Sequence, residues 1–168
     1  TTPLHSSAAS DVYKRQLIEL GHKVIVIDNE YSDAHDHFYY NDKAHYVKQD
    51  ICSYQRTKIF YAGVDYVFHI AAEARIQPAV ENPLNAVRIN ALGTATVLQC
   101  AREAGVKKVM YSSTSSAYGL ANESPNVETQ PNDCLNPYSV SKVAGENLCK
   151  MYTELFDLPT VILSLIHI

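Results

Sequence analysis

The clearest pattern along the chain is a series of short apolar runs separated by longer segments with helical spacing. Four of these runs are rich in β-branched and aromatic residues and lack strict alternation, which predicts buried strands. They are residues 23–28, 64–70, 106–112 and 159–163, with residues 45–47 as a weaker fifth candidate. Continuous apolar strands of this kind are typical of a parallel sheet covered on both faces.

Helical periodicity fills the segments between these strands. Residues 84–104 follow Asn82-Pro83, a suitable N-cap and first-turn proline, and end before Gly105. Further helices are expected at residues 139–156, at residues 53–61, and in a short segment before Gly21 that includes Leu17, Ile18 and Leu20. The alternation of strands and helices predicts an α/β fold, a Rossmann-like doubly wound parallel sheet, with a surface loop at residues 119–136.

The composition limits the classes of protein to consider. A chain of 168 residues with 46% hydrophobic and 19% charged residues is typical of one soluble globular domain. The net charge of -4 favours no nucleic-acid partner, and the apolar runs are too short to span a membrane. The first ten residues do not resemble a secretory signal, and the four cysteines include no Cys-x-x-Cys pair. We therefore expect a cytoplasmic protein without disulfide bonds.

One histidine pair could in principle bind a metal. His35 and His37 lie beside Asp33 and Asp36. No distant ligand cluster completes a coordination shell, so an exposed polar loop is the better interpretation and we expect no metal site.

The spacing Tyr-x-x-x-Lys occurs three times, as Tyr39/Lys43, Tyr54/Lys58 and Tyr138/Lys142. Context favours the third copy, because Tyr138 follows Asn136-Pro137 and opens a long predicted helix. Tyr138 and Lys142 then stand one turn apart on the same face, where the ammonium can favour the ionised phenol. Such a phenol can exchange a proton with a sugar hydroxyl during hydride transfer. The alternative is a surface pair without function.

A hydroxyl-rich run at residues 111–119 follows one of the predicted strands directly. Ligands bind at the carboxyl ends of strands in this architecture. A hydroxyl there, such as that of Thr114, could bridge a substrate oxygen and the Tyr138 phenol. The alternative is an ordinary serine-rich turn.

Two acidic positions are candidates for dinucleotide binding. Asp28 ends a strand and precedes Asn29, and a carboxylate there can accept hydrogen bonds from both adenosine ribose hydroxyls. It would also repel a 2′-phosphate, which favours NAD over NADP. Asp50 and Ile51 offer a carboxylate and an apolar neighbour for the edge and face of a purine. Asp50 could instead cap the helix at residues 53–61.

Small and amide side chains supply the remaining candidates. Ala71 and Ala72 close a strand and would let a dinucleotide approach the backbone, although alanines also suit tight strand–helix packing. Asn90 lies inside a predicted helix, where asparagine is mildly unfavourable. Its side chain could hold a loop or a cofactor carbonyl.

The motifs HIAAEARIQPAVENP, NALGT, SSTSSAYG and NPYSVSK, in this order and spacing, resemble the extended short-chain dehydrogenase/reductases of the NAD-dependent epimerase/dehydratase type. The likeness is greatest to the UDP-glucose and related UDP-hexose 4-epimerases. The resemblance implies that Tyr138 is the catalytic base, that Lys142 is its partner and holds the nicotinamide ribose, and that Thr114 bonds the sugar oxygen. It assigns NAD contacts to Asp28, Asn29, Asp50, Ile51, Ala71, Ala72, Asn90, Ser112, Tyr138 and Lys142.

The implied activity is epimerisation of a UDP-sugar through a transient 4-keto sugar. The related 4,6-dehydratases carry Asp-Glu where this chain has Ser115-Ser116, which favours epimerisation. The alternatives are another NAD-dependent nucleotide-sugar enzyme (a UDP-glucuronate decarboxylase, a 4,6-dehydratase, or an epimerase of N-acetylated or uronic sugars) and a non-catalytic NAD-binding module. The family often dimerises through the helices at residues 84–104 and 139–156, so we expect a homodimer of the full-length parent.

The sequence departs from the family pattern at both ends. The family begins with a strand and Gly-x-x-Gly-x-x-Gly, whose backbone binds pyrophosphate at a helix N-terminus, but this chain has no glycine before Gly21. Residues 1–16 and 164–168 match nothing in the pattern, so we expect foreign sequence at both junctions. Residues 17–163 would then form a partial NAD-binding domain without its first strand, an inactive fragment that retains little cofactor.

Overall fold

A computed structural model describes residues 6–31 and 40–164, with side chains from Val12 onward. The chain divides into two compact units, Thr1–Asp50 and Ile51–Ile168. The histidine pair His35 and His37 and the first Tyr-x-x-x-Lys copy, with Tyr39, lie outside the described residues.

The first unit contains one helix and a two-stranded parallel sheet. Helix α1 (Ser6–Glu19) packs against β1 (Val24–Asp28), and β1 pairs in parallel with β2 (Ala44–Lys48). The weak strand candidate at residues 45–47 is therefore confirmed as β2.

Helix α1 is longer than the sequence predicted. It begins at Ser6, well before Leu17, where the apolar residues of the predicted short helix begin. The reason is local, because neither glycine nor proline interrupts this segment. Leu20, expected inside the helix, lies just beyond it, where Gly21 takes a left-handed φ of 85°. Glycine adopts that conformation without steric cost.

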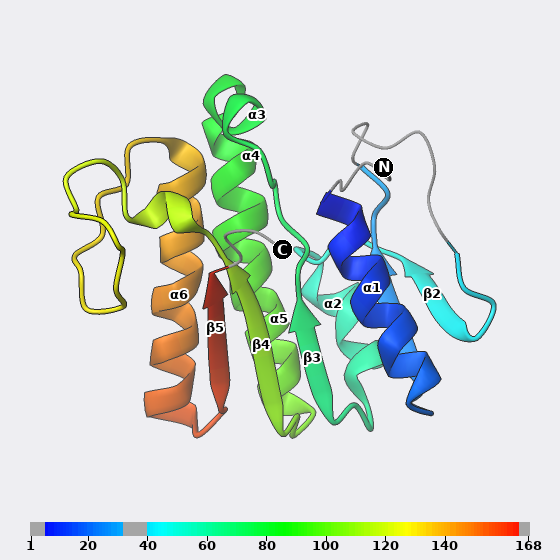
Figure 1. The fold of residues 1–168 in the computed structure, drawn as a ribbon. Helices are drawn as coiled ribbons and strands as arrows, with labels where there is room; N and C mark the ends of the chain where they lie inside the picture. Colours follow the sequence, from blue (N-terminus) through cyan, green and yellow to red (C-terminus); the bar gives the residue numbers. More distant parts are fainter. Residues whose placement is uncertain (1–5, 32–39, 165–168) are drawn as a thin grey trace. The chain divides into compact units, whose positions relative to one another are not determined.

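The second unit is built on a three-stranded parallel sheet in the order β3-β4-β5 (Figure 1). Strands β3 (Tyr66–His69), β4 (Lys108–Ser113) and β5 (Thr160–Ser164) confirm the remaining predicted strands to within two residues at each end. Helix α5 packs against β3, and α6 packs against β4 and β5. Because the three strands are parallel, their carboxyl ends lie at the same edge of the sheet.

The predicted helix at residues 84–104 is a composite. Asn82 caps it, since its Oδ1 accepts a hydrogen bond of 3.1 Å from the Asn85 amide. It is preceded by α3 (Ile76–Glu81) and then runs as α4 (Pro83–Val87), a π-helical segment η2 (Arg88–Gly93) and α5 (Thr94–Glu103). Such π-helical insertions are often found at functional sites.

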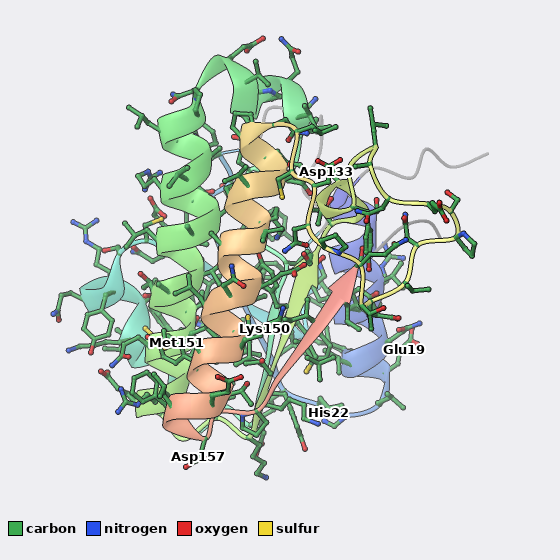
Figure 2. All side chains as sticks on the ribbon, turned by 90° about the vertical axis from the view of Figure 1, so that its left-hand side faces the viewer. Glu19, His22, Asp133, Lys150, Met151 and Asp157 are labelled. Carbon is green, nitrogen blue, oxygen red and sulfur yellow. The ribbon has the colours of Figure 1, made fainter. Side chains whose placement is uncertain are left out.

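Helix α6 (Pro137–Phe156) begins with a capping box. Asn136 Oδ1 accepts from the Ser139 amide at 2.9 Å, and Pro137 occupies the first turn. The helix ends at Asp157, which takes a left-handed φ of 52°. Figure 2 shows α6, with Lys150 and Met151 labelled, running beside the composite helix.

The remaining elements are short. They are α2 (Tyr54–Thr57), η1 (Lys58–Tyr61) and η3 (Ser115–Ala117). The segment after η3 is an irregular loop, as predicted, held together by Asp133, whose Oδ2 accepts from the Leu120 and Ala121 amides at 2.9 Å (Figure 2). Among the described helices, none has both the length and the apolar character needed to cross a membrane.

Candidate active site

Tyr138 and Lys142 lie in the first turns of α6, and the backbone carbonyl of each accepts a side-chain hydrogen bond. Ser141 Oγ donates to the Tyr138 carbonyl at 2.8 Å, and Tyr111 Oη, from β4, donates to the Lys142 carbonyl at 3.0 Å. The first bond and the capping box at Asn136 stabilise the start of the helix itself, whereas the bond from Tyr111 joins the helix to β4 and limits its rotation about its axis. The two predicted catalytic side chains therefore keep one orientation relative to the sheet.

Gly145 explains how α6 comes so close to β4. A Cβ at this position would overlap Tyr111 Oη, which is itself 1% exposed. The absence of a side chain at Gly145 thus lets the Tyr111 ring lie under the helix, where the Lys142 ammonium packs over it.

Lys142 is 3% exposed, which is unusual for a lysine. Its Nζ lies 4.3 Å from the centroid of the Tyr111 ring, a cation–π distance, and donates no hydrogen bond to any described residue. Burial lowers the pKa of Lys142 to about 8. The ammonium is desolvated while its three donors remain available to a ligand.

His69, at the end of β3, is a neutral neighbour of this ammonium. Its Nε2 lies 2.8 Å from Thr94 Oγ1, and the Thr94 hydroxyl donates its only proton to the Asn90 carbonyl at 2.6 Å. His69 Nε2 must therefore carry a proton and donate to Thr94. Burial, followed by the Lys142 charge, lowers the pKa of His69 to about 3.

Asn90 performs the first of the two roles that the sequence allowed. It is 1% exposed within η2, and its Oδ1 accepts from the Glu73 amide at 2.7 Å. Its Nδ2 donates to the Glu73 carbonyl at 3.1 Å and to Ser141 Oγ at 2.9 Å. Both amide protons are used in holding the loop after β3 against α6. A cofactor contact by this side chain stays a prediction.

Thr114 follows β4 directly and is buried. Its Oγ1 accepts from the Ser116 amide at 3.1 Å, which caps η3 and leaves the hydroxyl proton free to be donated. Ser112 is half-buried within β4, where strand alternation places it on the opposite face from Tyr111 and Ser113.

The carboxyl edge of the sheet gathers several predicted residues. Because β3 and β4 are parallel, Ala71 and Ala72 leave the sheet at the same edge as Thr114, and η3 packs against α6. Tyr138 is half-buried, and its hydroxyl bonds to no described residue. The Thr114 hydroxyl, the Tyr138 phenol and the Lys142 ammonium thus lie on the side of the second unit where β4 ends and α6 begins.

Three predicted cofactor residues belong to the first unit. Asp28 and Asn29 follow the end of β1, where their Oδ1 atoms accept from the amides of Glu30 (2.7 Å) and Tyr31 (3.1 Å). The third, Asp50, does not cap the following helix, because Ser53 is the N-cap residue of α2. The cofactor assignments of all three stay predictions.

Ile51 opens the second unit and packs against the composite helix. A Cβ at Gly93 would lie only 2.7 Å from Ile51 Cδ1, so the glycine admits this side chain. The predicted purine contact of Ile51 also stays a prediction.

Each unit, taken by itself, offers a group that can bond a ribose hydroxyl of a dinucleotide. In the second unit, Lys142 keeps ammonium protons that no described residue uses. In the first unit, the exposed Asp28 carboxylate keeps Oδ2 available within the described contacts. In the described part of the chain, no group of three or more histidine, cysteine or acidic side chains could hold a metal ion.

Several residues around the site were missed by the sequence reasoning. They are His69, Tyr111, Ser113, Ser141, Gly145 and Glu146. Spacing alone could have indicated Glu146, which lies four residues beyond Lys142 and so on the same helix face. Tyr111 and Ser113 lie in the hydroxyl-rich run at residues 111–119, but no sequence signal assigns these contacts to them or to the remaining residues, because the contacts join distant elements.

Comparison with known proteins gives consistent matches. The model of the NAD dependent epimerase/dehydratase family matches residues 12–168. The UDP-glucose 4-epimerase of Mycolicibacterium smegmatis is 32% identical over 148 residues, which cover 85% of this chain and 47% of that protein. The chain thus spans about half the length of the curated relatives it matches.

Solved structures show the same likeness. The UDP-glucose 4-epimerase of Thermotoga maritima, solved with UDP-glucose, superposes with a TM-score of 0.85 at 29% identity over 94% of this chain and 51% of that one. The dTDP-glucose 4,6-dehydratase of Streptomyces venezuelae, solved with NAD bound, gives 0.80 at 26% identity over 93% of this chain and 51% of that one.

Proposed function

Because the chain belongs to the NAD-dependent epimerase/dehydratase family, we propose that it carries the acid–base site of a UDP-hexose 4-epimerase. One observation supports this above the others. Thr114, Tyr138 and Lys142 belong to one side of the second unit, and each keeps a donor that no described residue uses.

The proposed chemistry follows from these groups. A bound NAD would supply the hydride acceptor and donor for C4 of the hexose, so that the configuration at C4 could invert through a 4-keto sugar. Tyr138 takes the proton of the C4 hydroxyl as the hydride leaves and gives it back afterwards. Thr114 donates its hydroxyl proton to the same sugar oxygen and so orients it. Both groups act on the oxygen on which charge changes during the reaction.

Lys142 has two tasks in this proposal. Its ammonium holds the nicotinamide ribose through hydrogen bonds, and its charge stabilises the negative charge that develops near the Tyr138 oxygen during proton transfer. The Tyr111 ring beneath it excludes water, so the charge is poorly screened. Asp28, at the end of β1, would accept hydrogen bonds from the adenosine ribose hydroxyls, which favours NAD over NADP.

Epimerisation is favoured over dehydration by the residues after Thr114. Elimination of water needs an additional acid and base beside the sugar, and the corresponding positions here are Ser115 and Ser116. Both serines belong to η3 or its cap, and neither can act as a carboxylate would.

The test uses a protein of full family length that contains this chain. We expect it to interconvert UDP-glucose and UDP-galactose, with UDP-N-acetylglucosamine as the second substrate to assay. Replacing Tyr138 by phenylalanine should lower kcat by about 10²–10⁴-fold and leave NAD binding nearly unchanged. A variant with wild-type turnover would refute the assigned base. NAD binding without turnover of any UDP-sugar by the unmodified protein would instead favour a non-catalytic module.

The full-length parent is also proposed to be a homodimer. Large apolar side chains remain exposed on both long helices, including Leu84 and Leu92 on the composite helix and Val140 and Leu155 on α6. Sedimentation of the full-length protein would test this, and a monomer at micromolar concentration would contradict it.

A further inference from the structure

Glu146 occupies a position on α6 that the chemistry described so far does not use. It lies one turn beyond Lys142 and two turns beyond Tyr138, so the three side chains share one face of the helix. Its side chain is only partly exposed.

A hydrogen bond connects Glu146 to the strand that carries the third reactive group. Ser113 Oγ donates to Glu146 Oε1, and Ser113 is the buried last residue of β4, directly before Thr114. The carboxylate therefore links the helix that bears Tyr138 and Lys142 to the strand end that bears Thr114. The other bridge described between β4 and α6, from Tyr111 Oη to the Lys142 carbonyl, begins two residues earlier on the strand than Ser113.

The charges around Lys142 give this carboxylate a second effect. The groups that face the ammonium are the Tyr111 ring on β4, His69 on β3, and Glu146 and Cys149 on α6. Tyr138 stands one turn before Lys142 on the same helix face. His69 is neutral, because its pKa is about 3, and burial raises the pKa of the Cys149 thiol to about 12. Cys149 and, after it, Glu146 oppose the loss of the Lys142 proton. Because the Cys149 thiol is still protonated near the pKa of Lys142, Glu146 supplies the carboxylate charge of the two.

We propose that Glu146 is a positioning residue of the acid–base site, which sets the spacing of Thr114 from Lys142 through its hydrogen bond with Ser113 and places a carboxylate one helical turn from the Lys142 ammonium. The inference rests on the proposed function for its catalytic part only. The effect on the Lys142 proton concerns the chain itself and can be measured without cofactor or substrate.

Two variants separate the charge from the link. Glu146→Gln keeps an Oε1 acceptor for Ser113 and removes the negative charge, whereas Ser113→Ala removes the hydrogen bond and keeps the charge. The Lys142 titration is followed by ¹³Cε NMR on the 168-residue chain, and the resonance is assigned by its loss in Lys142→Met. We expect Glu146→Gln to lower the Lys142 pKa by about half a unit or more, and Ser113→Ala to shift it by less than about 0.2 unit.

Turnover of the full-length protein gives the second readout. Glu146→Gln should move the alkaline limb of the kcat profile to lower pH by the same shift as the NMR titration. Ser113→Ala should lower kcat by about tenfold at every pH without a change in KM, since Thr114 is then misplaced. Glu146→Asp, which keeps the charge but has a shorter reach, should restore the Lys142 pKa and not kcat.

The control is Glu154→Gln, an exposed carboxylate two turns farther along α6, which should change neither readout. An unchanged Lys142 titration in Glu146→Gln would overturn the charge effect, and wild-type kcat in Ser113→Ala would overturn the link. If Glu146→Gln does not fold, the Lys142 titration in Glu146→Asp decides. This variant keeps the negative charge, so a Lys142 pKa that falls by about half a unit or more would contradict a role for charge. Failure of the proposed function appears differently, as absent turnover in the unmodified protein with the NMR shifts intact.

Discussion

Tyr54/Lys58 and Tyr138/Lys142 have the same spacing and different surroundings. At the first pair, Tyr54 Oη donates to Glu103 at 2.5 Å, and Lys58 Nζ lies 5.1 Å above the ring of Tyr54 itself. At the second pair, the lysine lies over the ring of a different tyrosine, and the Tyr138 hydroxyl bonds to no described residue.

The difference shows that spacing places the two groups on one helix face and does nothing more. The hydrogen bond to Glu103 raises the pKa of Tyr54, which opposes the ionisation that a base requires. Lys58 is exposed to solvent, so water screens its charge. Lys142 is desolvated over Tyr111 instead, where its charge acts strongly on nearby groups. The strand beneath the helix therefore distinguishes the surroundings of the two pairs.

The largest effect that separates the two pairs is expected in turnover. In the full-length protein, Lys142→Met should lower kcat/KM by about 10²–10³-fold, because the ammonium no longer supports Tyr138 or the nicotinamide ribose. Lys58→Met should change kcat/KM by less than about twofold. Steady-state assays with UDP-glucose measure both, and equal losses in the two variants would contradict the distinction.

The two lysines should also differ in how they link stability to pH. The folded pKa of Lys142 is about 8, below its ordinary value of 10.5, so the unfolded chain binds more protons between these pH values. Below about pH 8 the folded chain carries the full cost of burying the charged Lys142. As pH rises to 10.5, folded Lys142 loses its proton before the unfolded chain does, so the unfolding free energy increases by about 3 kcal/mol. Urea unfolding at pH 7.5 and pH 10 measures the change.

Comparison of variants isolates this contribution from other alkaline titrations. Lys142→Met should lose the rise in unfolding free energy, and Lys58→Met should keep it. The same pH dependence in Lys142→Met and in the unmodified chain would show that Lys142 is not desolvated in solution.

A smaller effect should follow from disturbing the strand–helix contact that buries Lys142. Gly145→Ala places a Cβ against Tyr111 Oη, so we expect a loss of about 1–3 kcal/mol in unfolding free energy. Asn147→Ala, an exposed position two residues farther along α6, should change it by less than about 0.5 kcal/mol. Chemical denaturation compares the two, and an equal effect would mean that the close approach is absent.

Much of the fold could be predicted because its signals are local. Apolar runs and turn residues predicted each of the five strands found in the described part of the chain, including the weak β2, and Asn136-Pro137 marked the start of α6. The length of α1 and the π-helical segment η2 were not predicted. The first has no capping signal in the sequence, and the second depends on the contacts of Asn90 and Gly93 with distant residues.

The sequence by itself determined which groups share a helix face and which strand end precedes Thr114, because helical and strand periods are properties of the local backbone. Only the tertiary structure decided that Tyr111 lies under Lys142, that His69 is neutral beside it and that Ser113 reaches Glu146. Desolvation and hydrogen bonding depend on the residues of neighbouring elements. For that reason the three copies of Tyr-x-x-x-Lys look alike in the sequence, while the two described copies differ in their chemistry.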